Sequence, residues 1–431
     1  MRRSSAVPAG KTLAATGLVS LFVLLATGGP VSGEDVPLPL GASDLPETRT
    51  VQELAPGVSL TRISRGTGTT APKDYQTTKR GPWQVQVVTI DPTVATGHLR
   101  SSYGTDLAGT EPVSQIAALT GAMAAVNASY FTFTASSSAP GDPVGLGMYD
   151  GTLISEPSSG TAEVSMLVDA RTNQVTFPGK LSWWGRMTNT VKNKGVKLDA
   201  LGHPPFVPPG CEDLKKPVKC KQTGQVVLLT PHFASKTPSG AGVEVVLNRK
   251  GCVYSKEKER GTKLKPRQTS IQATGRKTLR LLKIAKLDHS KGCFERTESL
   301  TDSTDTPVPT GPWMYGVNGR FALTRAGVAV VPNGQTSLFE RHPRTFVGRT
   351  SAGQIRIVTI DGRQPTSVGV RLREAAQVAL ALDMPDAINL DGGGSTTMVV
   401  NGALANSPSG GRERAVGDGL VYVPTPYVRK R

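Results

Sequence analysis

The chain has 431 residues, a formal net charge of +17 and a hydrophobic fraction of 37%. This length is too great for one small core and suits one large domain or two. Beyond Ala26 no run is apolar enough to cross a bilayer, which excludes a protein with several membrane spans.

The first residues have the pattern of a secretory signal peptide, which we assign to residues 1–33. Two arginines and a lysine precede an apolar run over residues 13–26, and small residues follow up to Gly33. The run is shorter than the roughly 20 residues of a membrane span, so secretion is favoured over an uncleaved membrane anchor.

The part that follows divides into a leader and the start of the main domain. Residues 34–80 are rich in Pro, Gly, Ser and Thr, and we expect a leader of low order there. Residues 81–178 carry periodic apolar patterns and turn signals. They predict strands over 83–90 and 122–126, a helix over 111–119 and a hairpin over 146–155.

Residues 179–310 form a basic middle module. From Lys180 to Leu300 there are 25 Lys or Arg against 9 Asp or Glu, so almost all of the net charge lies here. In an exported protein this surplus indicates attraction to an anionic envelope polymer, or else a solvated face that serves solubility. Aromatic residues are sparse and no nucleic-acid motif is present, so dedicated nucleic-acid binding is not expected.

The module also contains every cysteine of the chain. An even number of cysteines in an exported protein indicates disulfides, and three pairings are possible. We favour the two pairs that close the shorter loops, Cys211–Cys220 and Cys252–Cys293. Short strands are expected at 226–230, 243–247 and 279–284.

Residues 311–425 complete the main domain. The elements expected here are a hairpin over 321–331, a hairpin over 345–360, an amphipathic helix over 371–382 and a strand over 387–390. The fold class is therefore α+β, with mixed sheets and few helices.

Two segments of the main domain share a pattern. Val87–Asp91 (VVTID) is nearly repeated by Ile357–Asp361 (IVTID), and each precedes a helix and a strand that ends in an asparagine. We expect two related strand–helix–strand units that flank the basic module. In this hypothesis Asn127 and Asn389, at the two strand ends, face one site.

The last of these strands enters the most informative motif, Asn389-Leu390-Asp391 followed by three glycines and a Ser-Thr pair. Consecutive glycines allow close backbone approach to a ligand, and their amides can form an anion-binding nest. A carboxylate beside an anion site indicates chemistry that handles phosphate together with a developing positive charge.

The motifs NASYF, HPRT, VTIDGRQ and NLDGGGSTTMVVNG, which begin at Asn127, His342, Val358 and Asn389, together resemble the phosphodiester glycosidase family. The resemblance extends over roughly 81–423 and is densest after Glu340. It implies a hydrolase that cleaves the sugar–phosphate bond of a glycosyl phosphodiester.

Such cleavage passes through an oxocarbenium-like state and releases a phosphate monoester, which needs little protonation. We therefore place Asp391 at the anomeric centre and Arg344 on the phosphate, with Asp361 as a possible second carboxylate. The remaining candidates for substrate binding are Asn127, Thr345, Arg363, Asn389, Gly392, Gly393, Gly394, Ser395 and Thr396.

Several of these residues have a structural alternative. Asp361 is alternatively a turn-former that fixes Arg363, and Arg344 a surface salt bridge. His342 is favoured as a neighbour over a catalyst, and Glu156 is a weaker candidate acid.

No cofactor is required by this chemistry, although Asn389, Asp391 and a phosphate could bind calcium or magnesium. A non-catalytic glycan-binding or envelope-binding protein that uses the same pocket is the alternative function. A phosphatase or nuclease is disfavoured, because no cluster of His and Asp for two metal ions is visible.

Overall fold

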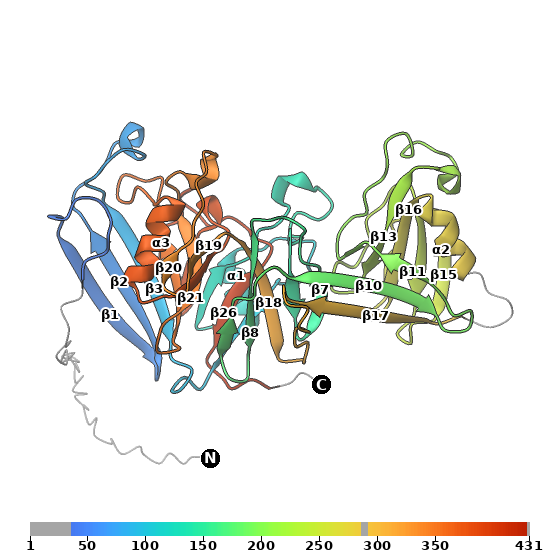
Figure 1. Ribbon diagram of the computed structural model, residues 1–431, viewed down its shortest axis with the longest axis horizontal. Coiled ribbons are helices and arrows are strands. Elements are labelled where there is room, and N and C mark those ends of the chain that lie inside the picture. The colour runs from blue at the N-terminus through green and yellow to red at the C-terminus, as the bar shows by residue number, and fades with distance from the viewer. Residues whose placement is uncertain (1–35, 286–291, 429–431) are drawn as a thin grey trace, which may run out of the picture. The chain divides into compact units, whose positions relative to one another are not determined.

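A computed structural model describes residues 36–285 and 292–428, so the signal peptide expected at 1–33 lies outside the described residues. In these ranges five β-sheets and three α-helices are present (Figure 1). The helices are α1 (Val113–Thr120), α2 (Lys277–Ala285) and α3 (Leu372–Ala381). The expected α+β class with few helices is confirmed. None of the helices in these ranges has the length and apolarity that a membrane crossing needs.

The largest sheet has eight strands and carries the asparagine end of one predicted unit. Its strands, in spatial order, are β1 (Glu47–Ala55), β2 (Val58–Arg65), β3 (Trp83–Ile90), β22 (Ile355–Ile360), β21 (Arg344–Arg349), β23 (Asp386–Asn389), β19 (Ala322–Arg325) and β20 (Val328–Ala329). Helix α3 covers it, because Leu372, Ala375, Ala376 and Ala379 recur at helical spacing and are all buried.

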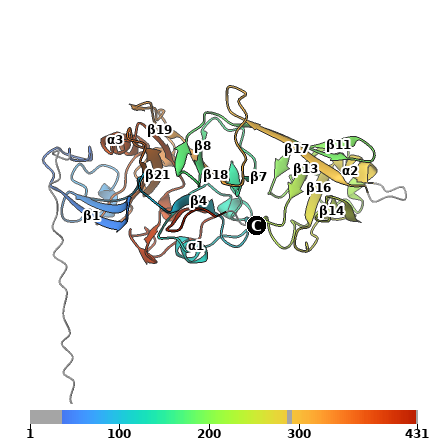
Figure 2. The same ribbon diagram turned by 90° about the horizontal axis from the view of Figure 1, so that it is seen from below.

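Two five-stranded sheets complete the main domain. One has the order β25 (Ala403–Leu404), β24 (Met398–Val400), β5 (Ala124–Asn127), β26 (Gly419–Val423) and β4 (His98–Ser102). The other has the order β7 (Thr152–Ser155), β6 (Gly147–Tyr149), β18 (Met314–Arg320), β8 (Glu163–Asp169) and β9 (Gln174–Thr176). Helix α1 packs on the sheet that contains β4 and β26 (Figure 2).

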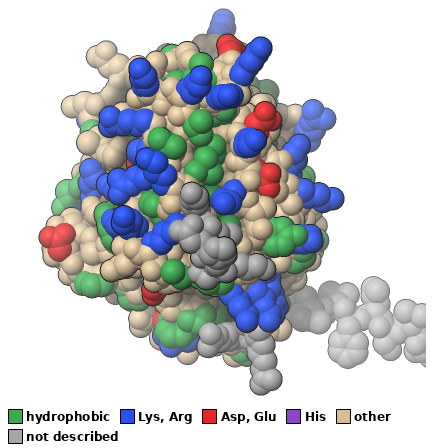
Figure 3. All heavy atoms as spheres, turned by 90° about the vertical axis from the view of Figure 1, so that its right-hand side faces the viewer, with side chains coloured by type: hydrophobic (Ala, Val, Ile, Leu, Met, Phe, Trp, Pro, Cys, Tyr) green, Lys and Arg blue, Asp and Glu red, His purple; other side chains and the backbone are tan. Residues whose placement is uncertain are grey.

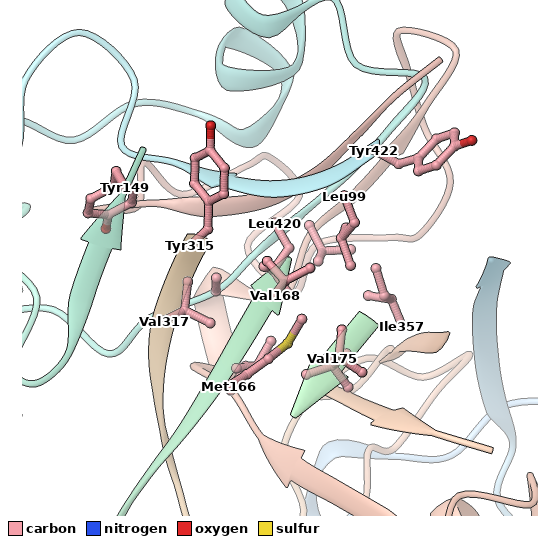
Figure 4. Packing of buried hydrophobic residues seen from close by; sticks show 14 of the residues in the cluster. Leu99, Tyr149, Met166, Val168, Val175, Tyr315, Val317, Ile357, Leu420 and Tyr422 are labelled. Carbon is pink, nitrogen blue, oxygen red and sulfur yellow. The ribbon is translucent and has the colours of Figure 1, made fainter. Parts of the chain in front are cut away.

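The three sheets of the main domain share one hydrophobic core. Met166 and Val168 from β8, Ile357 from β22 and Leu420 from β26 all lie in it (Figure 4). This packing brings strand ends from distant parts of the sequence to one place, which positions the candidate site.

The middle module forms two sheets of its own. One has the order β11 (Lys194–Leu198), β10 (Ser182–Asn189) and β17 (Phe294–Thr301). The other has the order β12 (Ala200–Leu201), β13 (Thr223–Leu229), β16 (Thr269–Gly275), β14 (Val243–Leu247) and β15 (Val253–Glu257). Disulfides join Cys211 to Cys220 and Cys252 to Cys293, the two pairs that the spacing favours.

Two local expectations are wrong. The described part of the leader, residues 36–80, is not of low order, because β1 and β2 lie in the largest sheet and Leu38 and Leu40 are buried. Residues 279–284 are not a strand but most of α2. Leu281, Ile284 and Ala285 are buried on one side of this helix, as a helical period requires.

The two predicted strand–helix–strand units differ in topology. In the first, β4 intervenes before α1, and β3 and β5 lie in different sheets. In the second, β22 and β23 both belong to the largest sheet. Their first strands, β3 and β22, pair antiparallel with each other. The strand ends at Asn127 and Asn389 are therefore brought together by the packing of the sheets. They do not occupy equivalent positions in two copies of one unit.

Candidate functional site

The two strand ends meet at the backbone of Asp391. The Asn127 Nδ2 donates to the Asp391 carbonyl at 2.6 Å, and the Asp391 amide donates to the Ala128 carbonyl at 2.9 Å. The Asn127 Oδ1 accepts from the Thr345 hydroxyl at 2.7 Å and from the Thr397 amide at 3.2 Å. Asn127 and Thr345 are both fully buried and engaged with protein atoms. They therefore position Asp391. Their hydrogen bonds to protein atoms do not favour the expected contact with substrate.

Asn389, at the end of β23, connects the turn to a buried tyrosine. Its Nδ2 donates to the Tyr130 hydroxyl at 2.9 Å and to the Arg320 carbonyl at 3.3 Å. Burial and the charge of Asp391 raise the pKa of Tyr130, so its phenol is neutral throughout the physiological range. The Arg320 guanidinium lies over the Tyr130 ring, 4.6 Å from its centroid. The Asn389 Oδ1 is buried and has no hydrogen-bond partner among the described residues.

Two of the three glycines after Asp391 do not offer the free amides that an anion-binding nest needs. The Gly393 amide donates to the Pro343 carbonyl at 2.9 Å, and the Gly392 amide bonds to the Asp391 carboxylate. The chain then turns through a short 3₁₀ helix, Gly393–Ser395, with Gly393 at a φ of +60°.

These glycines instead make room for guanidinium groups. A Cβ added to Gly393 would lie 3.2 Å from the Arg363 Nη2, and one added to Gly394 would lie 3.1 Å from the Arg414 Nη1. The turn thus allows two positive charges to approach the backbone next to Asp391.

Asp391 is the carboxylate of the site. Its side chain retains 15% exposure, and the Arg414 Nη2 lies 3.7 Å from its Oδ2. Burial raises its pKa, while hydrogen bonds from the Ser395 hydroxyl and the Gly392 amide and the charges of Arg414 and Arg320 oppose that rise. Asp391 is therefore a partly accessible carboxylate surrounded by cations.

Arg414 is held in place by two further contacts. Its Nε donates to the Ser395 hydroxyl at 3.2 Å, so Ser395 connects Arg414 to Asp391. Its guanidinium also lies 4.9 Å from the centroid of the Phe133 ring. Thr396, the other hydroxyl of the motif, is buried, and its Oγ1 has no hydrogen-bond partner among residues 36–285 and 292–428.

Arg363 approaches the turn from the end of β22. It has a φ of +57°, and its Nε donates to the His342 Nδ1 at 3.2 Å. Burial and the neighbouring Arg363 charge lower the pKa of His342, and its Nε2 faces the Ser337 carbonyl at 2.8 Å. A neutral imidazole with its proton on Nε2 satisfies both contacts. His342 therefore orients Arg363, which agrees with the interpretation of His342 as a neighbour.

Arg344 is bound mainly to backbone. Its Nε donates to the Val370 carbonyl at 3.1 Å, and its Nη2 donates to the carbonyls of Leu338 at 2.6 Å and Glu340 at 2.7 Å. The side chain is almost fully buried, which lowers its pKa to about 10. Only Nη1 has no hydrogen bond to a described residue. The expected bidentate grip on phosphate is thus replaced by a structural role in fixing residues 338–340.

Asp361 is also committed to structure. Its oxygens accept from the Asn406 Nδ2 at 2.9 Å and from the Ser407 amide at 3.1 Å, and the Gln86 Nε2 lies 3.5 Å away. Burial raises its pKa to about 6. These contacts favour the turn-forming alternative over a second catalytic carboxylate.

Two cavities that share wall residues lie near the candidate site. One of about 360 Å³ is lined by Arg320 and Glu163, and one of about 400 Å³ by Asp142, Glu156 and His203. Both include Val144 and Ser158 in their walls.

Glu156, the weaker candidate acid, lies in the second of these cavities. Its Oε2 accepts from the Leu201 amide at 2.7 Å, and burial raises its pKa. The His203 Nε2 is 3.6 Å from its Oε1, and the His203 Nδ1 is 3.9 Å from the Asp142 Oδ2. These contacts place Glu156 in an acidic cluster that is separate from Asp391.

A metal centre has no obvious donor set here. Within the described ranges no group of three or more His, Cys, Asp or Glu is arranged to hold a metal ion. The two oxygen donors considered for calcium or magnesium, on Asn389 and Asp391, lie close to Arg320 and Arg414.

Sequence reasoning missed three residues of the site. Arg414 and Arg320 supply charges next to Asp391, and Tyr130 connects Asn389 to Arg320. Tyr130 lies inside the NASYF motif, and Arg320 directly precedes the hairpin expected over 321–331. For Arg414 the sequence carries no signal, because only folding brings it to the triglycine turn.

Comparisons with known proteins show which family the chain resembles. Residues 241–423 match the family model described as phosphodiester glycosidase. Over 66 residues the chain is 48% identical to bovine N-acetylglucosamine-1-phosphodiester alpha-N-acetylglucosaminidase, covering 15% of this chain and 12% of the relative. Over 81 residues it is 40% identical to YomE, a prophage-derived protein of Bacillus subtilis, covering 19% of this chain and 13% of the relative. The chain thus spans about an eighth of the length of these curated relatives.

A solved structure matches a much larger part of the fold. A protein of Burkholderia pseudomallei, named "putative exported protein", superposes with a TM-score of 0.75 at 23% identity, over 90% of this chain and 98% of that one. This match shows the fold. The family match over residues 241–423 and the identity to the bovine enzyme over 66 residues confirm the resemblance to the phosphodiester glycosidase family that the sequence motifs indicated.

Proposed function

We propose that this protein is an exported hydrolase that cleaves the sugar–phosphate bond of glycosyl phosphodiesters in envelope or extracellular glycans. The observation that carries the proposal is the partly accessible Asp391 carboxylate beside the guanidinium groups of Arg414, Arg320 and Arg363. One negative and three positive side chains suit a substrate with an anionic phosphate next to a sugar carbon that becomes positive.

The chemistry follows from this charge arrangement. Arg414 and Arg363 bind the phosphate, and Asp391 lies at the anomeric carbon, where it stabilises the oxocarbenium-like charge. The bond between the anomeric carbon and the phosphate oxygen breaks, and the electron pair leaves with the phosphate monoester. Water supplies the hydroxyl group of the released sugar and one proton. Because the leaving phosphate is already anionic, the guanidinium charges replace most of the work of a general acid.

The other candidates act through these groups. Asn127 and Thr345 hold the Asp391 backbone, and Ser395 connects Asp391 to Arg414. Asn389 fixes the Tyr130 phenol. In this proposal the Nη1 of Arg344 is the only part of its guanidinium that is left for the phosphate.

Export and an envelope substrate have separate support. Two disulfides lie in the module, as expected for an oxidising compartment, and a protein of the same fold is named as exported. The charge surplus of the module favours an anionic partner such as a phosphate-containing polysaccharide.

The alternative function is a non-catalytic protein that binds such a glycan through the same pocket. A binding protein needs the cations but has no need of a carboxylate beside the phosphate, since Asp391 would repel the ligand. The presence of Asp391 among the cations therefore favours the enzyme.

The test is hydrolysis of a chromogenic sugar-1-phosphodiester by wild type, Asp391→Asn and Asp361→Asn. We expect Asp391→Asn to lower kcat by about 10²–10⁴-fold, and Asp361→Asn, whose contacts are structural, to stay within about tenfold. Equal rates for wild type and Asp391→Asn would remove Asp391 from the mechanism. Absence of hydrolysis with any such ester, combined with tight binding, would establish the non-catalytic alternative.

A further inference from the structure

Six cationic side chains of the module line one cavity. A cavity of about 730 Å³ lies between β10, β11 and α2, far from Asp391 in the chain order. Its charged lining residues are Arg186, Lys192, Lys194, Arg276, Arg280 and Lys283. None of the described residues that line it is acidic. Lys and Arg side chains gather on this end of the module, where few acidic side chains are visible (Figure 3).

The walls of the cavity are fixed by hydrogen bonds. The Asn189 Nδ2, at the end of β10, donates to the Ile284 carbonyl of α2 at 3.0 Å. The Arg280 Nη2 donates to the Gly195 carbonyl of β11 at 3.1 Å. A Cβ added to Gly195 would lie 2.6 Å from the Arg186 Nε, so this glycine provides space for that guanidinium. The cations are therefore mounted on a framework that is already organised.

Part of this positive charge is not neutralised by the residues that the structure describes. Lys194, Arg276 and Lys283 are exposed and form no ion pair with a described residue. By contrast, Lys277 on the same helix pairs with Asp199 at 2.6 Å. Like charges held together raise the free energy of the folded state, and a bound polyanion removes that cost.

We propose that this cavity is a binding site for the phosphate groups of a phosphodiester-linked polymer of sugars or polyols, separate from the Asp391 site. The identity of the polymer rests on the proposed function, whereas the anion site itself rests on the cavity. Guanidinium and ammonium groups from three elements match successive phosphates of a chain. The exposed Leu279 in the lining provides an apolar surface for a sugar ring.

A polysaccharide is favoured over a nucleic acid by the composition of the lining. Single-stranded nucleic acids bind to proteins by stacking bases on aromatic side chains as well as by charge. The described lining contains no aromatic residue. A site built from cations and one leucine therefore suits a polymer of sugars or polyols without bases.

The experiment measures binding of a poly(glycerol phosphate) teichoic acid to the full-length Asp391→Asn protein. The test variant adds Lys194→Gln, Arg276→Gln and Lys283→Gln. The matched control adds Lys250→Gln, Lys256→Gln and Lys258→Gln, three exposed lysines of the same module that lie outside the cavity. Both variants lose the same charge. We expect the affinity of the test variant for the teichoic acid to fall roughly tenfold or more, and the slope of log Kd against log salt concentration to decrease by about 3. The affinity of the control variant is expected to stay within about threefold of that of the Asp391→Asn protein.

Three results would overturn the proposal. Equal losses in the test and control variants would show binding by net charge alone. No measurable binding of the teichoic acid, or tighter binding of a single-stranded oligonucleotide of matched charge, would exclude the polymer assigned here. The same three substitutions are also made in the protein that retains Asp391, and hydrolysis of the small chromogenic ester by that variant tests the proposed function alone. Either proposal can therefore fail without the other.

Discussion

The glycines of the Asp391 turn provide space for side chains, in addition to conformational freedom. Gly393 needs its positive φ, but Gly394 does not have one, and a Cβ there would meet the Arg414 guanidinium at 3.1 Å. The position of Arg414 next to Asp391 therefore depends on the missing side chain of Gly394, three residues after Asp391. The Arg414 guanidinium can therefore lie 3.7 Å from the Asp391 carboxylate and also stack on the Phe133 ring.

Arg414→Gln tests this pair through the pH dependence of the reaction. The Arg414 charge favours the ionised form of Asp391 and so lowers its pKa, against the effect of burial. Without that charge the pKa of Asp391 rises, and the acid limb of kcat/KM, where Asp391 becomes protonated, moves to higher pH. We expect that shift together with a fall in kcat/KM of about 10²-fold.

Arg412→Gln is the matched control for this variant, since Arg412 is exposed and two residues away. Its acid limb is expected to coincide with that of wild type. An Arg414→Gln profile with the wild-type acid limb would contradict the assigned electrostatic pair.

The cations around Asp391 also predict how the enzyme responds to metal removal. Arg414 and Arg320 already supply positive charge at the carboxylate, and they oppose the approach of a divalent cation. We expect dialysis against EDTA to leave kcat/KM within about twofold, measured with the chromogenic ester. Loss of activity that calcium or magnesium restores would instead assign Asp391 and Asn389 as cation ligands.

The sequence predicted the location of the site better than the roles of its residues. The motif after Asn389 identified Asp391, because a carboxylate beside three glycines is visible in the sequence alone. Arg344 and Asp361 have the same residue types as a phosphate ligand and a catalytic acid, but their partners are backbone groups and an amide from distant segments. Arg414 was not predictable, since its position depends on tertiary packing.

At the scale of elements, local periodicity succeeded where the apolar face is clear. Helix α3 follows its pattern because its apolar face packs on the largest sheet, and β3 and β22 follow theirs because almost all of their residues are buried inside that sheet. Helix α2 was predicted as a strand because its apolar residues are interspersed with lysine and arginine. The leader was misjudged because β1 is mostly exposed and gains its stability from pairing with β2.

Asp361 connects two of these elements and predicts a pH-dependent contribution to stability. It lies at the end of β22 and holds the segment after β25 through Asn406 and Ser407. Its pKa in the folded protein is about 6, above the usual value for aspartate of about 3.9 in an unfolded chain. Between these values the folded state binds a proton that the unfolded state does not, so this group contributes more stability as the pH falls from about 6 to about 4.

Asp361→Asn removes this titration while keeping an acceptor for Asn406 and Ser407. We expect the free energy of unfolding of wild type, relative to Asp361→Asn, to increase by about 2 kcal/mol between pH 6 and pH 4. Urea denaturation at several pH values measures it. A difference that stays constant with pH would show that Asp361 has an ordinary pKa.

At the scale of the whole molecule, the basic module is part of the fold as well as an insertion. All strands of its two sheets lie between Ser182 and Thr301. However, Val227, Leu229 and Phe233 of the module belong to the same hydrophobic cluster as the main domain. The family match begins at residue 241, inside the module, and the solved structure of the same fold covers 90% of this chain.

Deletion of residues 179–310 therefore tests whether the module is a separable domain. Leu146, Met148 and Leu167 of the main domain pack against module residues in a second shared cluster, and deletion would expose them to water. Full burial of such a side chain stabilises a fold by about 1.5–3 kcal/mol. Exposure of several of them would therefore remove a large part of a typical folding stability of about 5–15 kcal/mol. We expect the deletion variant to be insoluble or unfolded by circular dichroism, and the complete chain to unfold in one calorimetric transition. A soluble deletion variant that still hydrolyses the chromogenic ester, or two resolved transitions in the complete chain, would show instead that the main domain has a core of its own and that the module only binds the polymer.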